Sequence, residues 1–149
     1  MSVPVLSAAL VGHQTPSFDV EIEKGRLRLF AKAIGETDPV YFDEAAASAA
    51  GHRSLPVPPT FYFCLEMERQ DPYDWFSELK LPLGKVLHAE QKFSYHQTAY
   101  AGDTVRFHGE VVDVYHKKGG ALEFLVHRNF VTRAGEAIAE FDRTIVIRH

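Results

Sequence analysis

The spacing of apolar residues divides the chain into a helical, loop-rich first half and a strand-rich second half. Leu27, Ala31 and Ile34 recur at intervals of four and three residues, which predicts an amphipathic helix over residues 23–34. Gly35 follows directly and is a typical helix terminator. The first structured element with a clear pattern is therefore a surface helix that buries one face.

Two further helices are predicted before the midpoint of the chain. Asp43 is a typical N-cap for a short helix over residues 44–50. Pro58 and Pro59 fit the first turn of a helix over about residues 60–69. That helix is apolar on every side of its first two turns, so we expect it to be buried.

Residues 71–84 are predicted to form a loop that Trp75 and Phe76 pin to the body of the protein. After this loop the apolar period changes to two, which indicates strands. In the first strand, from residue 86, alternation predicts Gln91 on one face and His88 on the other.

The remaining pattern predicts three more strands joined by tight turns. The second strand, residues 104–116, shifts its phase at Val112, which is typical of a β-bulge. A turn at residues 117–120 leads to a strand from Leu122, and a turn at residues 134–136 leads to a last strand up to Arg148. Four antiparallel strands and one buried helix predict an α+β fold in which a sheet wraps around a long helix.

Composition limits the classes of function. The 149 residues carry a formal charge of −4, without the basic surface that nucleic acid or anionic lipid would need. The stretch Val3–Val11 is mildly apolar but has no basic residues before it, and no segment approaches the ~20 apolar residues that span a bilayer. Cys64 lies in an apolar run and is expected to pack. We therefore expect one cytoplasmic domain, residues 1–149, with no membrane or nucleic-acid partner.

The segment Gly35–Asp43 reads G-E-T-D-P-V-Y-F-D. It resembles the signature of the MaoC-like (R)-specific hydratases, G-D-x-N-P-x-H-x-D, and Ala101–Val105 resembles the A-G-D-x-hydrophobic turn of that family. The likeness extends from Gly12 to Ile147 and is greatest to the N-terminal, FAS1-like subgroup. This subgroup includes non-catalytic subunits of mycobacterial (3R)-hydroxyacyl-ACP dehydratases. The resemblance implies a hot-dog fold and an acyl-CoA or acyl-ACP substrate, with no cofactor.

The same resemblance implies that an Asp and a His hold the reacting water and exchange protons with the substrate. Glu36 and Tyr41 stand at these two positions. Glu36 keeps the charge but adds a methylene, and a displacement of about 1 Å costs on the order of a hundredfold in rate. A tyrosine, with an ordinary pKa of about 10, is a poor base near neutral pH. Asp38 is expected to form a turn.

A third substitution concerns the thioester oxygen, which gains negative charge in the transition state. The resemblance implies that a backbone N–H at the start of the buried helix meets this oxygen, next to a His-Gly pair. Pro58 and Pro59 align with that pair, and proline has no N–H. Pro58, Pro59 and Thr60 are predicted to lie beside the substrate.

These substitutions leave two interpretations open. Either Glu36 and Tyr41 are remnants of a silent site, or Glu36 acts as a base with Tyr41 or Asp38 assisting. The first implies a MaoC-like partner that supplies catalysis. By likeness to hot-dog domains, which associate edge to edge, either a homodimer or a heterodimer with a catalytic MaoC-like subunit is expected.

Two other functions remain, an acyl-thioester-binding module and a hot-dog thioesterase in which Glu66 would act. The alternative without a catalytic role, which is favoured, places Glu66 at the exposed, charged end of its helix. The eight histidines form no metal-binding motif, so no metal site is predicted.

Overall fold

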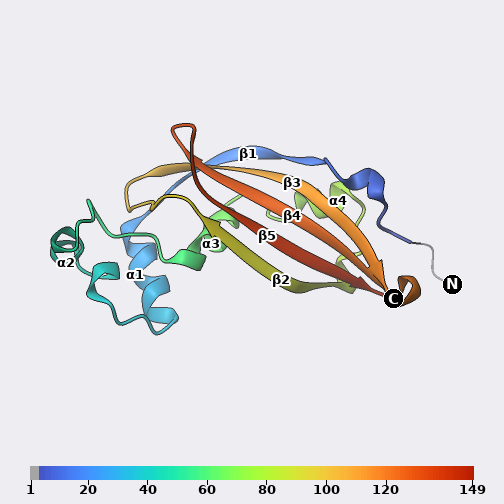
Figure 1. Ribbon diagram of the computed structural model, residues 1–149, viewed down its shortest axis with the longest axis horizontal. Coiled ribbons are helices and arrows are strands. Elements are labelled where there is room, and N and C mark those ends of the chain that lie inside the picture. Colours follow the sequence, from blue (N-terminus) through green and yellow to red (C-terminus); the bar gives the residue numbers. More distant parts are fainter. Residues whose placement is uncertain (1–3) are drawn as a thin grey trace.

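The computed structural model describes residues 4–149, so Val3, where the apolar N-terminal stretch begins, lies outside the described part. An antiparallel sheet of five strands forms the body, in the order β1-β3-β4-β5-β2 (Figure 1). The α+β architecture predicted from the sequence is confirmed. The strands are β1 (Gln14–Glu21), β2 (Val86–Tyr95), β3 (Thr104–Lys117), β4 (Leu122–Arg133) and β5 (Glu136–Arg148).

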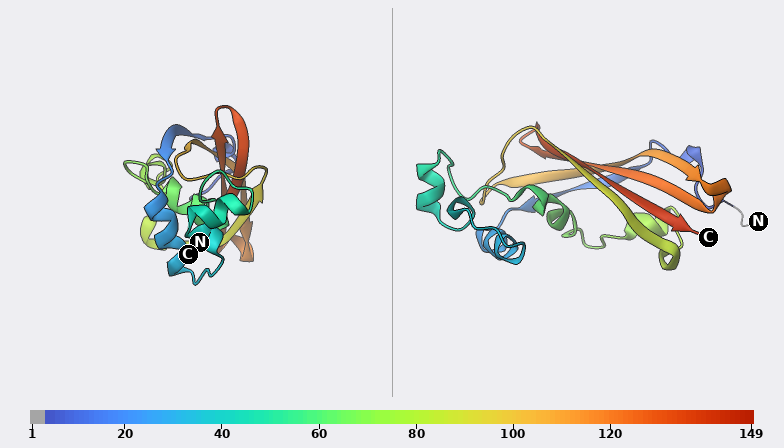
Figure 2. Two further views of the ribbon diagram at one scale, coloured as in Figure 1. Left: turned by 90° about the vertical axis from the view of Figure 1, so that its left-hand side faces the viewer. Right: turned by 60° about the horizontal axis from the view of Figure 1, so that its bottom comes forward.

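The helices lie along one face of this sheet (Figure 2). In both figures α1 and α2 lie at one end of the sheet, α4 lies toward the other end, and α3 lies between them. Within residues 4–149, no helix is long and apolar enough to cross a membrane. The α-helices are α1 (Lys24–Ala33), α2 (Glu44–Ala49), α3 (Tyr62–Glu66) and α4 (Asp74–Glu78), and short 3₁₀ turns cover Ala8–Leu10, Pro39–Tyr41, Pro59–Phe61, Leu83–Lys85 and Lys118–Gly120.

The first two helices form where the apolar pattern and the capping residues predicted them. Leu27 and Ala31 are buried on α1, whereas Ile34, at its C-terminal end, is exposed. The Asp43 side chain accepts a hydrogen bond from the Ala45 N–H at 3.0 Å, which confirms its role as the N-cap of α2.

The first strand, β1, was missed by the sequence pattern, which placed only helices and loops in the first half. β1 is an edge strand that pairs with β3, and its register shifts between Thr15 and Phe18. Pro16 lies inside this irregularity. Because proline lacks an N–H, it interrupts both the ladder and the alternation by which a strand is recognised. The sheet therefore has five strands instead of four.

The middle of the chain also differs in detail. The buried helix predicted over residues 60–69 is an α-helix only over α3, and it continues as turns whose N–H groups bond three residues back, up to Arg69. Residues 71–84, predicted to be a loop, contain α4. Trp75 and Phe76 are buried, as expected, and they anchor α4 to the sheet.

Two of the register shifts in the sheet bear on the sequence predictions. The predicted phase shift in β3 is confirmed, because the pairing with β4 slips between Val111 and Asp113. A second slip, which was not predicted, falls between His88 and Glu90 on β2. The prediction that His88 faces away from Gln91 is therefore wrong, and the two side chains lie 2.9 Å apart from His88 Nε2 to Gln91 Oε1.

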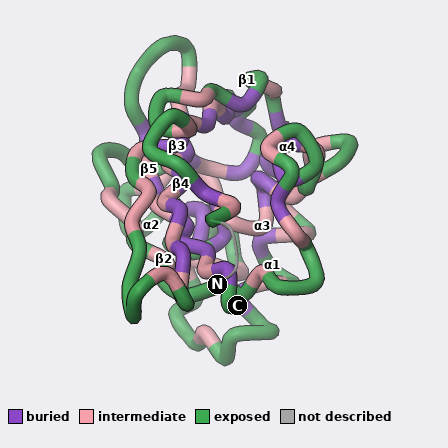
Figure 3. The backbone as a smooth tube through the Cα atoms, turned by 90° about the vertical axis from the view of Figure 1, so that its right-hand side faces the viewer, coloured by how far each residue is buried: buried purple, intermediate pink, exposed green. Residues whose placement is uncertain are grey.

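The buried residues form two clusters between the sheet and the helices. Figure 3 shows the buried segments of the backbone in purple. One cluster surrounds α1 and α3 and includes Leu27, Leu65 and Phe107. The other lies under α4 and includes Trp75 and Ile145. The larger of the two cavities described below lies between the two clusters.

Two buried polar residues hold the end of the sheet near α4. The fully buried carboxylate of Glu123 accepts hydrogen bonds from the Val5 and Leu6 N–H groups and from the rings of His116 and His149. Burial alone would raise the pKa of Glu123, but these hydrogen bonds outweigh it and lower the pKa to about 2.

The second of these residues is His127, whose ring stacks on Trp75 with the centroids 4.4 Å apart. Its Nε2 lies 3.3 Å from Thr15 Oγ1. A Cβ on Gly109 would approach both Thr15 and His127 closer than atoms allow, so the strand needs glycine there. Burial, followed by the charges of nearby cationic groups, lowers the pKa of His127 to about 3 and keeps the ring neutral.

Candidate functional site

The hydratase-like loop between α1 and α2 is held together by its own backbone. One carboxylate oxygen of Glu36, Oε1, accepts hydrogen bonds from the Thr37 and Asp38 N–H groups at 2.9 and 3.0 Å. The Asp38 side chain accepts from the Val40 N–H at 3.1 Å, which confirms Asp38 as a turn former. Glu36 is thus used locally, as a turn-forming group.

Tyr41 ends the 3₁₀ turn of this loop and is half-buried. It lines a pocket of about 290 Å³ together with Tyr62, Tyr95 and other residues from the start of α3 and the end of β2. Burial raises the pKa of Tyr41 above its ordinary value, and the charges of Glu36 and Asp38 raise it further. The phenol therefore stays protonated near neutral pH, so it can form hydrogen bonds but is not available as a base.

The structure separates the three residues before α3 that were predicted to lie beside the substrate. Pro59 lines the same pocket as Tyr41, and its carbonyl accepts a hydrogen bond from the Tyr95 hydroxyl at 2.9 Å. Pro58 is buried and Thr60 is exposed, and neither belongs to the lining of this pocket. Glu36 is not part of the lining either. The structure thus brings Tyr41 and Pro59 together but leaves the Glu36 carboxylate in its own loop.

Two histidines to which the sequence analysis gave no role also line this pocket. His52 Nδ1 lies 3.1 Å from the Tyr100 hydroxyl, and His96 Nε2 lies 3.7 Å from a carboxylate oxygen of Glu140. Burial raises the pKa of Tyr62, on the pocket wall, to about 12. In the described part of the chain, no three His, Cys, Asp or Glu side chains are grouped so that they could hold a metal ion.

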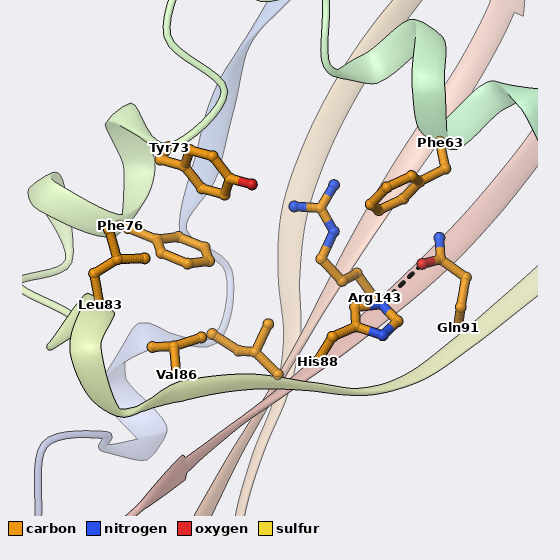
Figure 4. Close-up of a pocket in the computed structure, with 9 residues that line it drawn as sticks. Phe63, Tyr73, Phe76, Leu83, Val86, His88, Gln91 and Arg143 are labelled. Atoms are coloured by element: carbon orange, nitrogen blue, oxygen red, sulfur yellow. Dashed lines mark hydrogen bonds between the residues drawn. The ribbon is translucent and has the colours of Figure 1, made fainter.

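A larger cavity, of about 580 Å³, opens on the other side of α3, between α4 and β2. Figure 4 shows Tyr73, Phe76 and Leu83 on one side of it and Phe63 and Gln91 on the other, with the Arg143 guanidinium between them. Val86, His88 and Ile145 complete the lining. The sequence pattern predicted no cavity at this position.

An ion pair lies against this cavity. Arg143 Nη2 donates to Glu66 Oε2 at 2.5 Å, and the two side chains are only 4% and 1% exposed. The expectation that Glu66 lies at an exposed helix end is therefore wrong. Burial raises the pKa of Glu66 above its ordinary value, against the opposing effect of Arg143. The missed signal was the position of Arg143, a charged residue in phase with the inward-facing Phe141, Ile145 and Ile147 of β5.

A five-stranded antiparallel sheet with short helices on one face, and a signature loop that shares a pocket with the residues before α3, is the arrangement of the hot-dog MaoC-like dehydratases. The sequence comparison agrees with the fold. The family model described as "FAS1-like, dehydratase domain region" matches residues 9–141, and the chain belongs to this family.

The likeness to individual proteins and solved structures covers most of the chain. A UPF0336 protein of Saccharopolyspora erythraea is 33% identical over 147 residues, covering 96% of this chain and 92% of that protein. The HadBC (3R-hydroxyacyl-ACP dehydratase) complex of Mycobacterium tuberculosis is 26% identical with a TM-score of 0.82, covering 95% and 99% of the two chains. The ChsH1–ChsH2 complex of the same organism shares the fold, with 23% identity, a TM-score of 0.75, and coverage of 91% and 84%.

Proposed function

We propose that this chain is a subunit of an acyl-thioester hydratase or dehydratase with a degenerate active site, and that a catalytic hot-dog partner completes the enzyme. The substrate would be a trans-2-enoyl or (3R)-hydroxyacyl thioester of CoA or ACP. The chain would contribute part of the acyl-binding region and the subunit interface, acting in the cytoplasm as the sequence predicts.

The use of the Glu36 carboxylate carries this proposal. A base for water activation has to reach the water in a fixed geometry. Glu36 Oε1 already accepts two backbone hydrogen bonds from Thr37 and Asp38. A proton accepted by this carboxylate would remove its negative charge and so weaken these two bonds within the loop.

The other two positions support the same conclusion. The raised pKa of Tyr41 removes it as a base near neutral pH. Pro58 and Pro59 offer no N–H to a developing oxyanion at the start of the helical segment. Loss of the base, its partner and the oxyanion donor together is more consistent with a silent site than with three separate adjustments.

The structural neighbours support a partner. HadBC and ChsH1–ChsH2 are complexes of two differently named subunits, and the chain overlays on them over most of its length. By likeness, we propose that β2, an edge strand in the described sheet, is where the partner would pair. A homodimer is the competing assembly.

The experiment compares hydration of crotonyl-CoA and longer enoyl-CoA thioesters by the purified chain alone and by the chain co-expressed with a homologue that has an intact D-x-N-P-x-H signature. We expect no turnover by the chain alone and turnover by the complex. The co-expressed homologue must also be assayed alone, because the proposal requires that adding this chain changes its rate or its chain-length preference. Strong hydration by the purified chain would refute the proposal.

A binding module without any enzyme partner is the second candidate, and the cavity of about 580 Å³ beside Arg143 is the observation that favours it. Calorimetric titration with acyl-CoA separates the two candidates. Thioester binding without turnover in any pairing supports the module. The thioesterase candidate loses support because the Glu66 carboxylate is bonded to Arg143.

A further inference from the structure

The cavity between α4 and β2 combines apolar walls with a small group of unused hydrogen-bond donors. Phe63, Tyr73 and Phe76 supply aromatic surface, and Leu83 and Ile145 supply aliphatic surface. The Arg143 side chain extends from β5 into the space between these residues (Figure 4). Ligand sites typically have this composition, with apolar walls and a few polar groups that fix orientation.

Arg143 is held in a fixed position. Its Nη2 is bonded to Glu66, and its guanidinium carbon lies 4.8 Å from the centre of the Phe63 ring. Among residues 4–149, its Nε has no hydrogen-bond partner although it is shielded from solvent. A buried donor without an acceptor costs about 1–3 kcal/mol, so an acceptor supplied by a ligand would be favoured at this position.

Gln91, on the neighbouring strand β2, also carries a buried N–H group without an acceptor in the described chain. It pairs directly with Arg143 across β2 and β5, so the two side chains emerge side by side on the same face of the sheet. Its Oε1 is engaged by His88 Nε2. Its Nε2 is buried and, within the described chain, meets no acceptor. Two neighbouring side chains on the cavity wall thus carry unused N–H groups.

The charge balance selects the kind of acceptor. Glu66 already compensates the charge of Arg143, and both side chains are buried. A carboxylate ligand would add a second negative charge beside Glu66 in a region that disfavours unpaired charge. A carbonyl or hydroxyl oxygen accepts hydrogen bonds without this penalty.

We propose that this cavity binds an apolar group that carries a neutral oxygen acceptor, a keto or hydroxyl oxygen, which the Arg143 guanidinium and the Gln91 amide recognise. One step rests on the function proposed above, namely that in the assembled enzyme the group is an oxygenated acyl tail. The binding itself belongs to the chain alone and requires no hydratase activity. Its failure and the failure of the proposed function are therefore distinguishable.

The test uses two probes of similar shape, acetophenone and cumene, of which only the first has a carbonyl. Nitrogen-15 NMR of the purified chain follows the Arg143 Nε–H and Gln91 side-chain amide signals during each titration. We expect both probes to shift signals of the cavity-lining residues. Only acetophenone is expected to shift the two side-chain N–H signals in the direction of hydrogen bonding.

Variants measure the same effect as affinity. Gln91→Leu should weaken acetophenone binding about five- to tenfold, the size of one lost hydrogen bond, and leave cumene binding within about twofold. Arg143→Lys keeps a cation for Glu66 but removes Nε, and should act in the same direction. If Arg143→Lys fails to fold, Gln91→Leu, at a half-buried position on an edge strand, carries the test. Gln70→Leu, at an exposed position away from the cavity, is the matched control.

Three results would overturn the proposal. The first is that neither probe perturbs the cavity-lining residues. The second is that Gln91→Leu changes the affinities for acetophenone and cumene by the same factor, which would mean that no carbonyl is recognised. The third is that benzoate binds more tightly than acetophenone, which would show a charged acceptor in place of a neutral one.

Discussion

The two pockets on either side of α3 differ in what their polar residues do for the fold. Beside the signature loop, Glu36 and Asp38 bond to backbone groups within two residues of themselves. Beside the larger cavity, Arg143 and Glu66 join β5 to α3 across 77 positions of sequence. A loop held by local bonds can lose its chemistry while the fold stays intact, whereas a buried ion pair between distant elements cannot change without consequences for stability.

The largest effect is expected at the ion pair. Arg143→Met leaves the Glu66 carboxylate buried without its partner, and should lower the free energy of unfolding by about 3–5 kcal/mol. The double variant Glu66→Gln/Arg143→Met should recover much of this loss, because no uncompensated charge remains. Urea unfolding measures both. A single variant as stable as the unmodified chain would contradict the claim that the pair is buried.

A smaller loss is expected at the end of the sheet near α4. Glu123→Gln removes the charge that binds two backbone N–H groups and two histidines, and should cost about 2–4 kcal/mol at pH 7. The folded pKa of about 2 lies below the ordinary value of 4.5, so this stabilisation is present above pH 4.5 and disappears as the pH falls toward 2. The two proteins should therefore converge in stability near pH 2. A constant difference down to that pH would be inconsistent with the assignment.

His127 should make the fold sensitive to milder acid. Its pKa of about 3 lies below the ordinary 6.5, so below pH 6.5 the unfolded chain takes up a proton that the folded chain refuses. Stability should fall between pH 6.5 and pH 3, by at most about 1.4 kcal/mol per pH unit from this residue. The free energy of unfolding of His127→Gln, measured from pH 7 to pH 5, should depend less steeply on pH than that of the unmodified chain. An unchanged slope would assign the acid sensitivity elsewhere.

The smallest effect is expected at the signature loop. Tyr41 is half-buried and lines the smaller pocket, so Tyr41→Phe should change the free energy of unfolding by no more than about 0.5 kcal/mol. The same denaturant experiment checks this value. A loss comparable to that of Arg143→Met would mean that the loop supports the fold, and the contrast between the two pockets would fail.

The sequence predicted the parts of the fold that follow from a regular period. The α1 stripe, the Asp43 cap and the β3 bulge each produce a pattern over neighbouring residues. β1 was missed because Pro16 interrupts its alternation. The slip in β2 was missed because Leu87 and Ala89 alternate regularly with His88 and Glu90, so the sequence shows no break at the bulge. Irregular pairing is decided by the partner strand, which a single segment does not reveal.

The candidate site was predictable only where its residues are contiguous. The resemblance of Gly35–Asp43 located Glu36 and Tyr41, but it did not show that the Glu36 carboxylate bonds its own loop. The pairing of Glu66 with Arg143 joins distant elements, so it depends on how α3 lies across β5. Of this pair, only the position of Arg143 on the otherwise apolar inward face of β5 was visible in the sequence.

The most direct measurement of the central claim, a silent site at Glu36 and Tyr41, uses the complex with a catalytic homologue. Hydration of an enoyl-CoA thioester is compared between the unmodified complex, one in which this chain carries Glu36→Ala and Tyr41→Phe, and one in which the partner's Asp/His pair is replaced. We predict a rate within about twofold of the unmodified complex for the first variant and loss of turnover for the second. Loss of turnover from the substitutions at Glu36 and Tyr41, with the complex still assembled, would show that this chain performs the chemistry and would contradict the account.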